Sequence, residues 1–195
     1  MNFFISDIHF CDINTFTLDN RPFKNITQYD KYILKSINKY VKKNDTLYIL
    51  GDLMDCDNTH SRFWEKSAKY IKKIRGNIIL IMGNNEERIV KYFFGGNFEK
   101  FKSYCLSLGI KDVKYEDYIS FGGYNFYLTH EPINHKNGYV TLFGHIHRSK
   151  GLWQSFGLNM SCDINHYRPY AEKDILFQLK EKEIYWDNDE NLRLL

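Results

Sequence analysis

Residues 77–88 read NIILIMGNNEER, and this stretch decides the fold class that we expect for the chain. An apolar run closes at Gly83, two asparagines follow, and Glu86 and Glu87 come next. A short apolar run bounded by turn residues is typical of a buried central strand in an α/β protein. The dipole at the amino end of a helix favours acidic side chains there. The stretch therefore predicts a strand, a polar loop and then a helix.

The same alternation of strand and helix precedes this stretch. Apolar runs at 3–6 and 46–50 predict two earlier strands. Apolar residues recur at helical spacing over 29–41, after a Thr27 cap, and again over 63–74. The order βαβαβ implies a parallel sheet with right-handed crossovers.

The rhythm changes after a helical stretch over roughly 84–108. Residues 116–130 alternate and turn at Gly122-Gly123, which predicts a hairpin. Two further strands, a late helix and a last strand are predicted, in that order, at 139–145, 152–161, 171–182 and 183–186. Parallel strands followed by hairpins predict two sheets packed together with helices outside.

The composition fits a single domain over 1–195. Hydrophobic residues make up 43% and aromatic residues 17%, more than a disordered chain holds. The net charge of +3 comes with both signs interspersed, so a nucleic-acid partner is not indicated. The four cysteines form no C-x-x-C pair, and the start of the chain lacks a signal-peptide pattern. No run approaches the roughly 18 apolar residues of a membrane span. We therefore expect a cytoplasmic protein with no membrane partner.

Each of five apolar runs is followed by residue types that bind metal ions. These residues are, in chain order, Asp7, His9, Asp52, Asn84, His130, His145 and His147. In α/β sheets the carboxyl ends of the strands are where sites assemble, so we expect these side chains to converge. Any one of them alone is more often structural than a ligand, but their joint occurrence after five strands favours a metal site.

The number of donors indicates two ions. Three oxygen donors and four imidazoles exceed the positions around one ion. The D-x-H and H-x-H spacings would let an extended segment present two ligands on one side. Asp52, in the middle of the set, is expected to bridge the two ions. Mixed nitrogen and oxygen ligation suits Mn, Fe, Zn or Ni, of which we favour Mn.

In this order, D-x-H, G-D, G-N, T-H and G-H-x-H resemble the signature of the calcineurin-like metallophosphoesterase superfamily. The segments DNRPF at 19–23 and CDINHYRPY at 162–170 are similar to those of small stand-alone prokaryotic and phage members. The resemblance implies an α/β fold of the four-layer αββα type, in which two mixed sheets are flanked by helices.

The resemblance also implies how the ligands divide. It assigns one ion to Asp7, His9 and His147, the other to Asn84, His130 and His145, and a bridging role to Asp52. Two ions roughly 3.5–4 Å apart would share a hydroxide that attacks phosphorus in line.

The chain departs from the family pattern at Asn85. Many members have a histidine there, which is thought to protonate the leaving group or to steady the phosphate. An amide donates a hydrogen bond but cannot act as a general acid. Either Asn85 stabilises a transition-state oxygen, or another group supplies the proton, or the substrate has a good leaving group. The candidate substitutes are His135, His166 and Tyr167, and an exposed loop imidazole is the competing interpretation of both histidines.

Three arginines are candidates for binding substrate phosphate. Arg148 directly follows the H-x-H ligands, and Arg21 and Arg168 each precede a proline. A guanidinium suits phosphate oxygens, but a structural ion pair is an equally good interpretation for each of the three. Arg88 is expected on the solvated side of its helix.

We therefore predict a dinuclear metal-dependent phosphoesterase with Asn85, His135 and Arg148 as catalytic candidates. Phosphodiesters are the preferred substrates, because the chain is small and has no obvious peptide-binding insertion. The alternatives are a phosphomonoesterase or a nuclease of the same fold, or a binding scaffold with little turnover. The complete ligand set argues against the scaffold.

Overall fold

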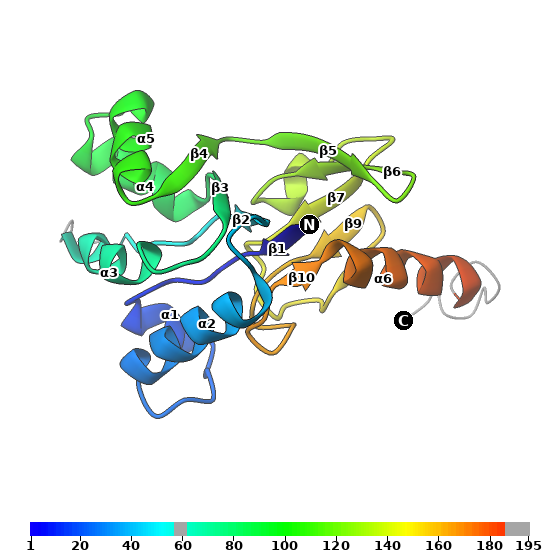
Figure 1. Cartoon of the computed structure of the whole chain (residues 1–195), viewed down its shortest axis with the longest axis horizontal. Coiled ribbons are helices and arrows are strands. Elements are labelled where there is room, and N and C mark those ends of the chain that lie inside the picture. The colour runs from blue at the N-terminus through cyan, green and yellow to red at the C-terminus, as the bar shows by residue number, and fades with distance from the viewer. Residues whose placement is uncertain (57–61, 186–195) are drawn as a thin grey trace.

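The computed structural model describes residues 1–56 and 62–185 (Figure 1). Its strands are β1 (Asn2–Ile5), β2 (Thr46–Leu50), β3 (Asn77–Ile81), β4 (Ile110–Lys114), β5 (Asp117–Phe121), β6 (Tyr124–Leu128), β7 (Val140–Phe143), β8 (Trp153–Gln154), β9 (Gly157–Asn159) and β10 (Tyr170–Ala171). Its helices are α1 (Ile13–Leu18), α2 (Ile26–Tyr40), α3 (Ala68–Ile71), α4 (Asn84–Phe93), α5 (Phe98–Ser107) and α6 (Glu172–Tyr185), with 3₁₀ helices η1 (Arg62–Ser67) and η2 (Pro132–Asn134).

The first sheet has the strand order β10-β1-β2-β3-β4. Strands β1 to β4 run parallel, and β10 is antiparallel to β1. The predicted βαβαβ unit is confirmed, with α2 between β1 and β2, and with η1 and α3 between β2 and β3. Parallel strands bring their carboxyl ends to one edge of the sheet, which is where the polar segments follow.

The central strands are apolar throughout because their side chains alternate between two cores. In β2, Leu47 and Ile49 pack with the helices, whereas Tyr48 and Leu50 pack toward the second sheet. Fully burying such a side chain contributes about 1.5–3 kcal/mol. Burial on both faces therefore holds the strand ends in fixed positions.

The second sheet has the order β5-β6-β7-β9-β8 and is also mixed, with antiparallel pairs at both edges and parallel pairs between them. The predicted hairpin is confirmed, since β5 pairs with β6 and Phe121 lies opposite Tyr124. Gly122 and Gly123 form its turn with φ of 59° and 85°, values that favour glycine. The strand predicted over 152–161 is instead the short antiparallel pair β8 and β9.

Helices flank the two sheets, as expected for the fold class. Figure 1 shows α1 to α5 on one side of the sheets and α6 on the other. Helix α2 packs against the first sheet through Tyr29, Ile33 and Ile37. Helix α6 places Ile175 and Leu179 in the core that the two sheets share. The α/β fold with two mixed sheets and flanking helices is therefore confirmed.

Two helix predictions were wrong in their boundaries. The cap of α2 is Asn25 instead of Thr27, because the Asn25 side chain accepts a hydrogen bond of 2.9 Å from the Gln28 amide. The helix predicted over 84–108 is two helices, α4 and α5. Gly95 and Gly96 separate them with φ of 62° and 77°, which no right-handed helix contains.

The last strand, predicted over 183–186, is wrong for residues 183–185. These residues extend α6 to Tyr185, and Trp186 lies outside the described residues. Lys and Glu, which fill positions 180–183, are strong helix formers. None of the helices in the described part of the chain has the length and apolar character needed to cross a lipid bilayer.

Candidate metal centre

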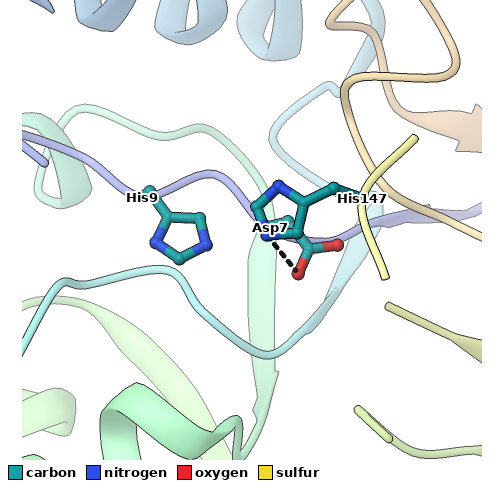
Figure 2. Close-up of side chains that lie close together, drawn as sticks. All are labelled: Asp7, His9 and His147. Atoms are coloured by element: carbon teal, nitrogen blue, oxygen red, sulfur yellow. Dashed lines mark ion pairs between the residues drawn. The ribbon is translucent and has the colours of Figure 1, made fainter. Parts of the chain in front are cut away.

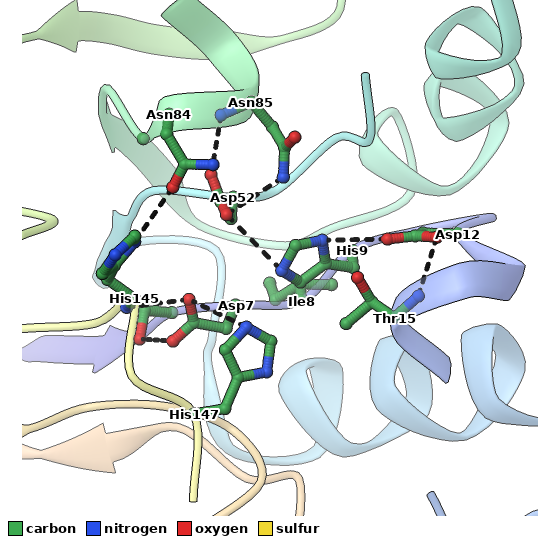
Figure 3. Close-up of polar contacts among 12 residues, drawn as sticks. Asp7, Ile8, His9, Asp12, Thr15, Asp52, Asn84, Asn85, His145 and His147 are labelled. Atoms are coloured by element: carbon green, nitrogen blue, oxygen red, sulfur yellow. Dashed lines mark hydrogen bonds and ion pairs between the residues drawn. The ribbon is translucent and has the colours of Figure 1, made fainter. Parts of the chain in front are cut away.

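The seven predicted ligand residues lie together at one edge of the two sheets, and Figure 3 shows six of them by name. Asp7 and His9 follow β1, Asp52 follows β2, Asn84 opens α4 after β3, His130 follows β6, and His145 and His147 follow β7. Asp7, His9, Asp52 and His130 are at most 3% exposed. Buried ionisable groups need charged or hydrogen-bonding partners, because the transfer of a charge out of water without such partners costs free energy.

The ligand segments have an unusual backbone. Asp7, His9, Asp52, His145 and His147 all have φ between 45° and 73°. Non-glycine residues in this left-handed region cost about 1–3 kcal/mol each and cluster at functional sites. The extended geometry expected for the D-x-H and H-x-H pairs is therefore wrong. Left-handed residues at both ends of each pair turn the chain, yet both side chains of each pair face the same centre.

Asp7, His9 and His147 form the first group of ligands. One ligand atom from each lies within 4.8 Å of the others, and His147 Nε2 is 3.8 Å from Asp7 Oδ1 (Figure 2). His9 Nε2 is buried and has no hydrogen-bond partner among the described residues. This ring nitrogen faces Asp52 Oδ2 at 3.5 Å without a hydrogen bond, an arrangement that fits metal ligation through its lone pair.

Asp7 is held as a fixed anion. Burial would raise its pKa, but His147, His130 and His9 outweigh burial and lower it. The Ser6 hydroxyl donates to Oδ2 at 2.7 Å, and the His145 amide donates to Oδ1 at 2.9 Å. The position of this carboxylate is therefore set before any ligand binds.

Asn84, His130 and His145 form the second group. Asn84 Oδ1 lies 3.0 Å from both His130 Nε2 and His145 Nδ1, and these two ring nitrogens are 3.3 Å apart. The other ring nitrogen of His130 donates to the Leu50 carbonyl at 2.8 Å. When the ring is neutral, that bond leaves the lone pair on Nε2, as metal ligation requires.

Asp52 lies between the two groups. Its Oδ2 is 3.5 Å from His9 Nε2 in the first group, and its Oδ1 is 3.6 Å from His130 Nε2 in the second. One carboxylate therefore faces a histidine of each group with a different oxygen.

Asn85 holds the Asp52 carboxylate. Its backbone amide donates to Asp52 Oδ1 and its side-chain Nδ2 donates to Asp52 Oδ2, both at 3.0 Å (Figure 3). Asn85 is 5% exposed. The side-chain amide of Asn85 is thus directed at a candidate metal ligand.

Glu86 fixes the loop that carries Asp52. Its fully buried carboxylate accepts hydrogen bonds from the backbone amides of Gly83, Asp52, Leu53 and Met54, at 2.9–3.1 Å. Burial and the charge of Asp52 raise the pKa of Glu86 to about 7. The sequence had predicted only that Glu86 lies at the start of a helix.

Two carboxylates orient His147 from behind. Its Nδ1 hydrogen-bonds to Asp19 Oδ2 at 2.6 Å and lies 3.4 Å from Asp163 Oδ2. Burial disfavours the imidazolium, but Asp163 and Asp19 outweigh burial and raise the pKa of His147 to about 10. A carboxylate behind a histidine directs its other nitrogen toward a metal ion.

Arg21 has a structural role. Its guanidinium binds Asp163 through Nε and Nη2, at 3.0 and 2.7 Å, and donates to the carbonyls of Asp7 and Ile8. The residue is 3% exposed. Of the two interpretations left open, these contacts match the structural ion pair. They tie the 162–168 loop to the segment that carries Asp7.

The other candidate residues lie outside the two groups of predicted ligands. His135 is exposed and stacks on Phe156 at 4.5 Å, in a neighbouring cavity. Arg148 is exposed.

His166 and Arg168 line a separate cavity beside α2, and the Tyr167 ring is buried against Phe23 and Tyr29. The structure thus brings Asn85 to the predicted ligands, and it does not bring His135, His166 or Tyr167 into hydrogen-bond contact with them among the described residues.

Two cavities of about 360 Å³ each open on the candidate centre, and Asn84 lines both. The first lies beside His130 and is lined by Glu87, Glu116, Glu131 and Lys136, among others. The second lies over His9, Asp52, Asn85, His145 and His147, and Arg88 is the one Lys or Arg among its described lining residues. The expected exposure of Arg88 holds, but the side chain faces this cavity.

The donors fit divalent cations of borderline softness, since imidazole nitrogens and carboxylate or amide oxygens surround both positions. Strands that deliver such donors to one edge, with open cavities beside them, define a candidate metal-binding site. The family model of calcineurin-like phosphoesterases matches residues 3–192, so the chain belongs to this family, whose members bind divalent metals and hydrolyse phosphate esters.

One relative matches the chain over most of its length, and one solved structure shares its fold. The chain is 28% identical over 190 residues to the uncharacterized protein MJ1445 of Methanocaldococcus jannaschii, covering 92% of this chain and 91% of that protein. The crystal structure of AQ665 from Aquifex aeolicus, a protein of unknown function, has a TM-score of 0.64 at 23% identity, with 91% and 98% of the chains covered. The E. coli phosphoesterase Yfce has a TM-score of 0.47 at 15% identity, with 82% and 77% covered.

Sequence reasoning missed Asp19, Asp163 and the cavity position of Arg88. Asp19 and Asp163 do lie in the two segments, 19–23 and 162–170, that resemble those of small family members. The sequence therefore indicated the two segments but not the role of these residues. Their contacts with His147 join parts of the chain that are far apart in the sequence.

Proposed function

We propose that the protein is a dinuclear metal-dependent phosphodiesterase. The observation that carries this proposal is the position of Asp52, whose two oxygens face His9 and His130, histidines of different ligand groups, at 3.5 and 3.6 Å. A carboxylate in that position is suited to bridging two cations.

Each group of ligands holds one ion in this proposal. Asp7, His9 and His147 hold the first, Asn84, His130 and His145 hold the second, and Asp52 is shared. When bound, two such ions supply a hydroxide nucleophile and neutralise phosphoryl charge. We propose Mn²⁺ for both positions, because it accepts mixed nitrogen and oxygen ligands. The four cysteines, all among the described residues, form no disulfide, which suits a reducing compartment, so we propose that the activity is cytoplasmic.

The two cavities support a diester over a monoester. They meet at Asn84, so a phosphoryl group at the centre has room for one substituent on each side. A monoester would use only one of them. Three glutamates line the first cavity, which makes it a poor path for the polyanionic strand of a nucleic acid.

The chain's own residues would position the reacting groups. Asn85 keeps the shared carboxylate in one orientation, as its two hydrogen bonds to Asp52 indicate. Arg88 would bind a phosphoryl oxygen from the side of the second cavity. His135 and Arg148, the other catalytic candidates, would have to act from the rim of the site, since both are exposed.

The test compares wild-type protein with Asp52→Ala after reconstitution with Mn²⁺. We expect wild-type protein to bind two ions and to hydrolyse bis(p-nitrophenyl) phosphate with a higher kcat/KM than p-nitrophenyl phosphate. Asp52→Ala should lose both the activity and the second ion. Asp112→Ala, which removes a surface carboxylate paired with Lys102, is the matched control and should behave as wild type. Equal rates in wild type and Asp52→Ala, or one ion per wild-type chain, would overturn the proposal.

A further inference from the structure

The cavity beside α2 that contains His166 and Arg168 has a basic lining and lies away from the metal centre. It has a volume of about 310 Å³ and is formed by α2 and the loop between β9 and β10, which lie side by side (Figure 1). Its lining consists of Tyr32, Lys35, Ser36, Lys39, Tyr40, His166 and Arg168. No candidate metal ligand is among them, so occupancy of this cavity and of the metal centre can be measured separately.

The charge of this cavity is of one sign. Lys35, Lys39 and Arg168 carry positive charge, His166 adds an imidazole, and no carboxylate is among the described lining residues. The chain as a whole is nearly balanced in charge, with 27 basic and 24 acidic residues. A concave surface whose charged lining residues are all cations concentrates anions, because the low-dielectric walls focus the field.

Arg168 is fixed in place, unlike a solvated surface arginine. Its Nε donates to Asn165 Oδ1 at 3.0 Å, and Asn165 Nδ2 donates back to the Arg168 carbonyl at 3.1 Å. Asn165 is 6% exposed, so the pair is anchored in the protein. A guanidinium held in this way has less conformational entropy to lose when it binds an anion.

Aromatic rings border the same cavity. Tyr32 is 46% exposed, although its ring packs on Phe23 at 5.0 Å. One part of the ring is therefore available to a ligand, while the other is supported by protein. Exposed tyrosine rings stack on nucleobases and similar planar groups.

We propose that this cavity binds a nucleoside monophosphate. Its phosphate would contact Arg168, Lys35 and Lys39, and its base would stack on Tyr32. The volume lies at the lower end of the range for small-molecule sites, which suits a ligand of this size. The spacing of Lys35 and Lys39 alone would also suit the polar face of an amphipathic helix. That interpretation does not explain why Arg168 is fixed or why the Tyr32 ring is exposed.

Calorimetric titration with AMP tests the proposal. The protein is kept in excess chelator, so that the metal centre cannot bind phosphate and the result does not depend on hydrolysis. We expect AMP to bind wild-type protein at a single site, and inorganic phosphate and adenosine to bind at least about tenfold more weakly. Absence of AMP binding would overturn the proposal, and phosphate binding as tight as that of AMP would overturn the role of Tyr32.

Variants separate the site from general charge attraction. Arg168→Gln and Lys39→Gln should each weaken AMP binding by about tenfold or more, because each removes a charge-assisted hydrogen bond. Tyr32→Ala should weaken the binding of AMP but not that of phosphate. Lys31→Gln, an exposed lysine of α2 outside the lining, is the matched control and should bind AMP as wild type does. An equal loss in Lys31→Gln and Lys39→Gln would refute a defined site. Thermal unfolding of each variant checks that the fold is retained.

Discussion

Asn85 donates two hydrogen bonds to Asp52, one from its backbone amide to Oδ1 and one from its side chain to Oδ2, both 3.0 Å long. Asp52 in turn faces a histidine of each ligand group. Asn85, at which the sequence departs from the motifs that it resembles, is therefore in contact with the carboxylate that we propose to be shared. This contact indicates that Asn85 positions the Asp52 carboxylate, whereas the sequence had raised the possibility of proton donation.

Asn85→Ala should lower kcat/KM and Mn²⁺ affinity by about 10–100-fold, as is usual when a residue that orients a metal ligand is removed. The loss should be the same for good and poor leaving groups, because positioning does not depend on the leaving group. A series of aryl phosphodiesters, together with Mn²⁺ titration, measures both effects. A loss that grows with the pKa of the leaving group would instead assign proton or hydrogen-bond donation to Asn85.

Asp19→Ala should weaken Mn²⁺ binding by the first ligand group by about 10–100-fold. The variant removes the 2.6 Å hydrogen bond to His147 Nδ1, while Asp163 keeps its pair with Arg21 and preserves the fold. Titration of metal-free protein with Mn²⁺ gives the affinity, and thermal unfolding reports on the fold. Unchanged affinity would show that Asp163 alone orients the imidazole.

Glu86→Ala should destabilise the protein by at least about 3 kcal/mol, because it leaves four buried backbone amides without their acceptor. For a chain of this size that corresponds to a fall in Tm of roughly 6–12 °C. Urea denaturation and calorimetry measure it. Glu87→Gln, an exposed neighbour in the same turn, is the control and should unfold as wild type does. Equal stability of the two variants would contradict the role given to Glu86.

Arg88→Gln should raise KM and lower kcat/KM for phosphate esters by about tenfold, because it removes the guanidinium that lines the second cavity. Lys91→Gln removes a positive charge from the same helix outside that cavity and should leave both constants unchanged. Steady-state kinetics at several salt concentrations distinguish contact from long-range attraction. An equal effect of both substitutions would assign the loss to general electrostatics.

Mn²⁺ should stabilise the fold as well as support activity. At a concentration of about 100 times its Kd, binding at one site adds about 2.7 kcal/mol to the free energy of unfolding, or roughly 5–11 °C in Tm. Calorimetry with and without chelator measures the shift, which Asp52→Ala should reduce. A Tm that chelator leaves unchanged would argue against ion binding by the folded protein.

The sequence by itself determined the fold class and the set of residues that the fold brings together. Apolar runs of five or so residues, bounded by turn residues, predicted buried strands, and polar residues directly after them were expected to converge at the carboxyl ends of those strands. The order of those residues was specific enough to indicate the family. These features are local, so hydrophobic periodicity and spacing were sufficient to find them.

Only the tertiary structure decided what surrounds those residues. That Asn85 binds Asp52, that Glu86 clamps a loop more than thirty positions away, and that Asp19 and Asp163 orient His147 all depend on contacts between distant segments. The left-handed backbone of Asp7 and His9 likewise depends on the packed strands around it. Asp and His enter this region more readily than most residues, but at a cost in free energy, so local preference alone would not select it. Side-chain partners of this kind follow from the packing of the whole fold, and the sequence pattern of one segment does not contain them.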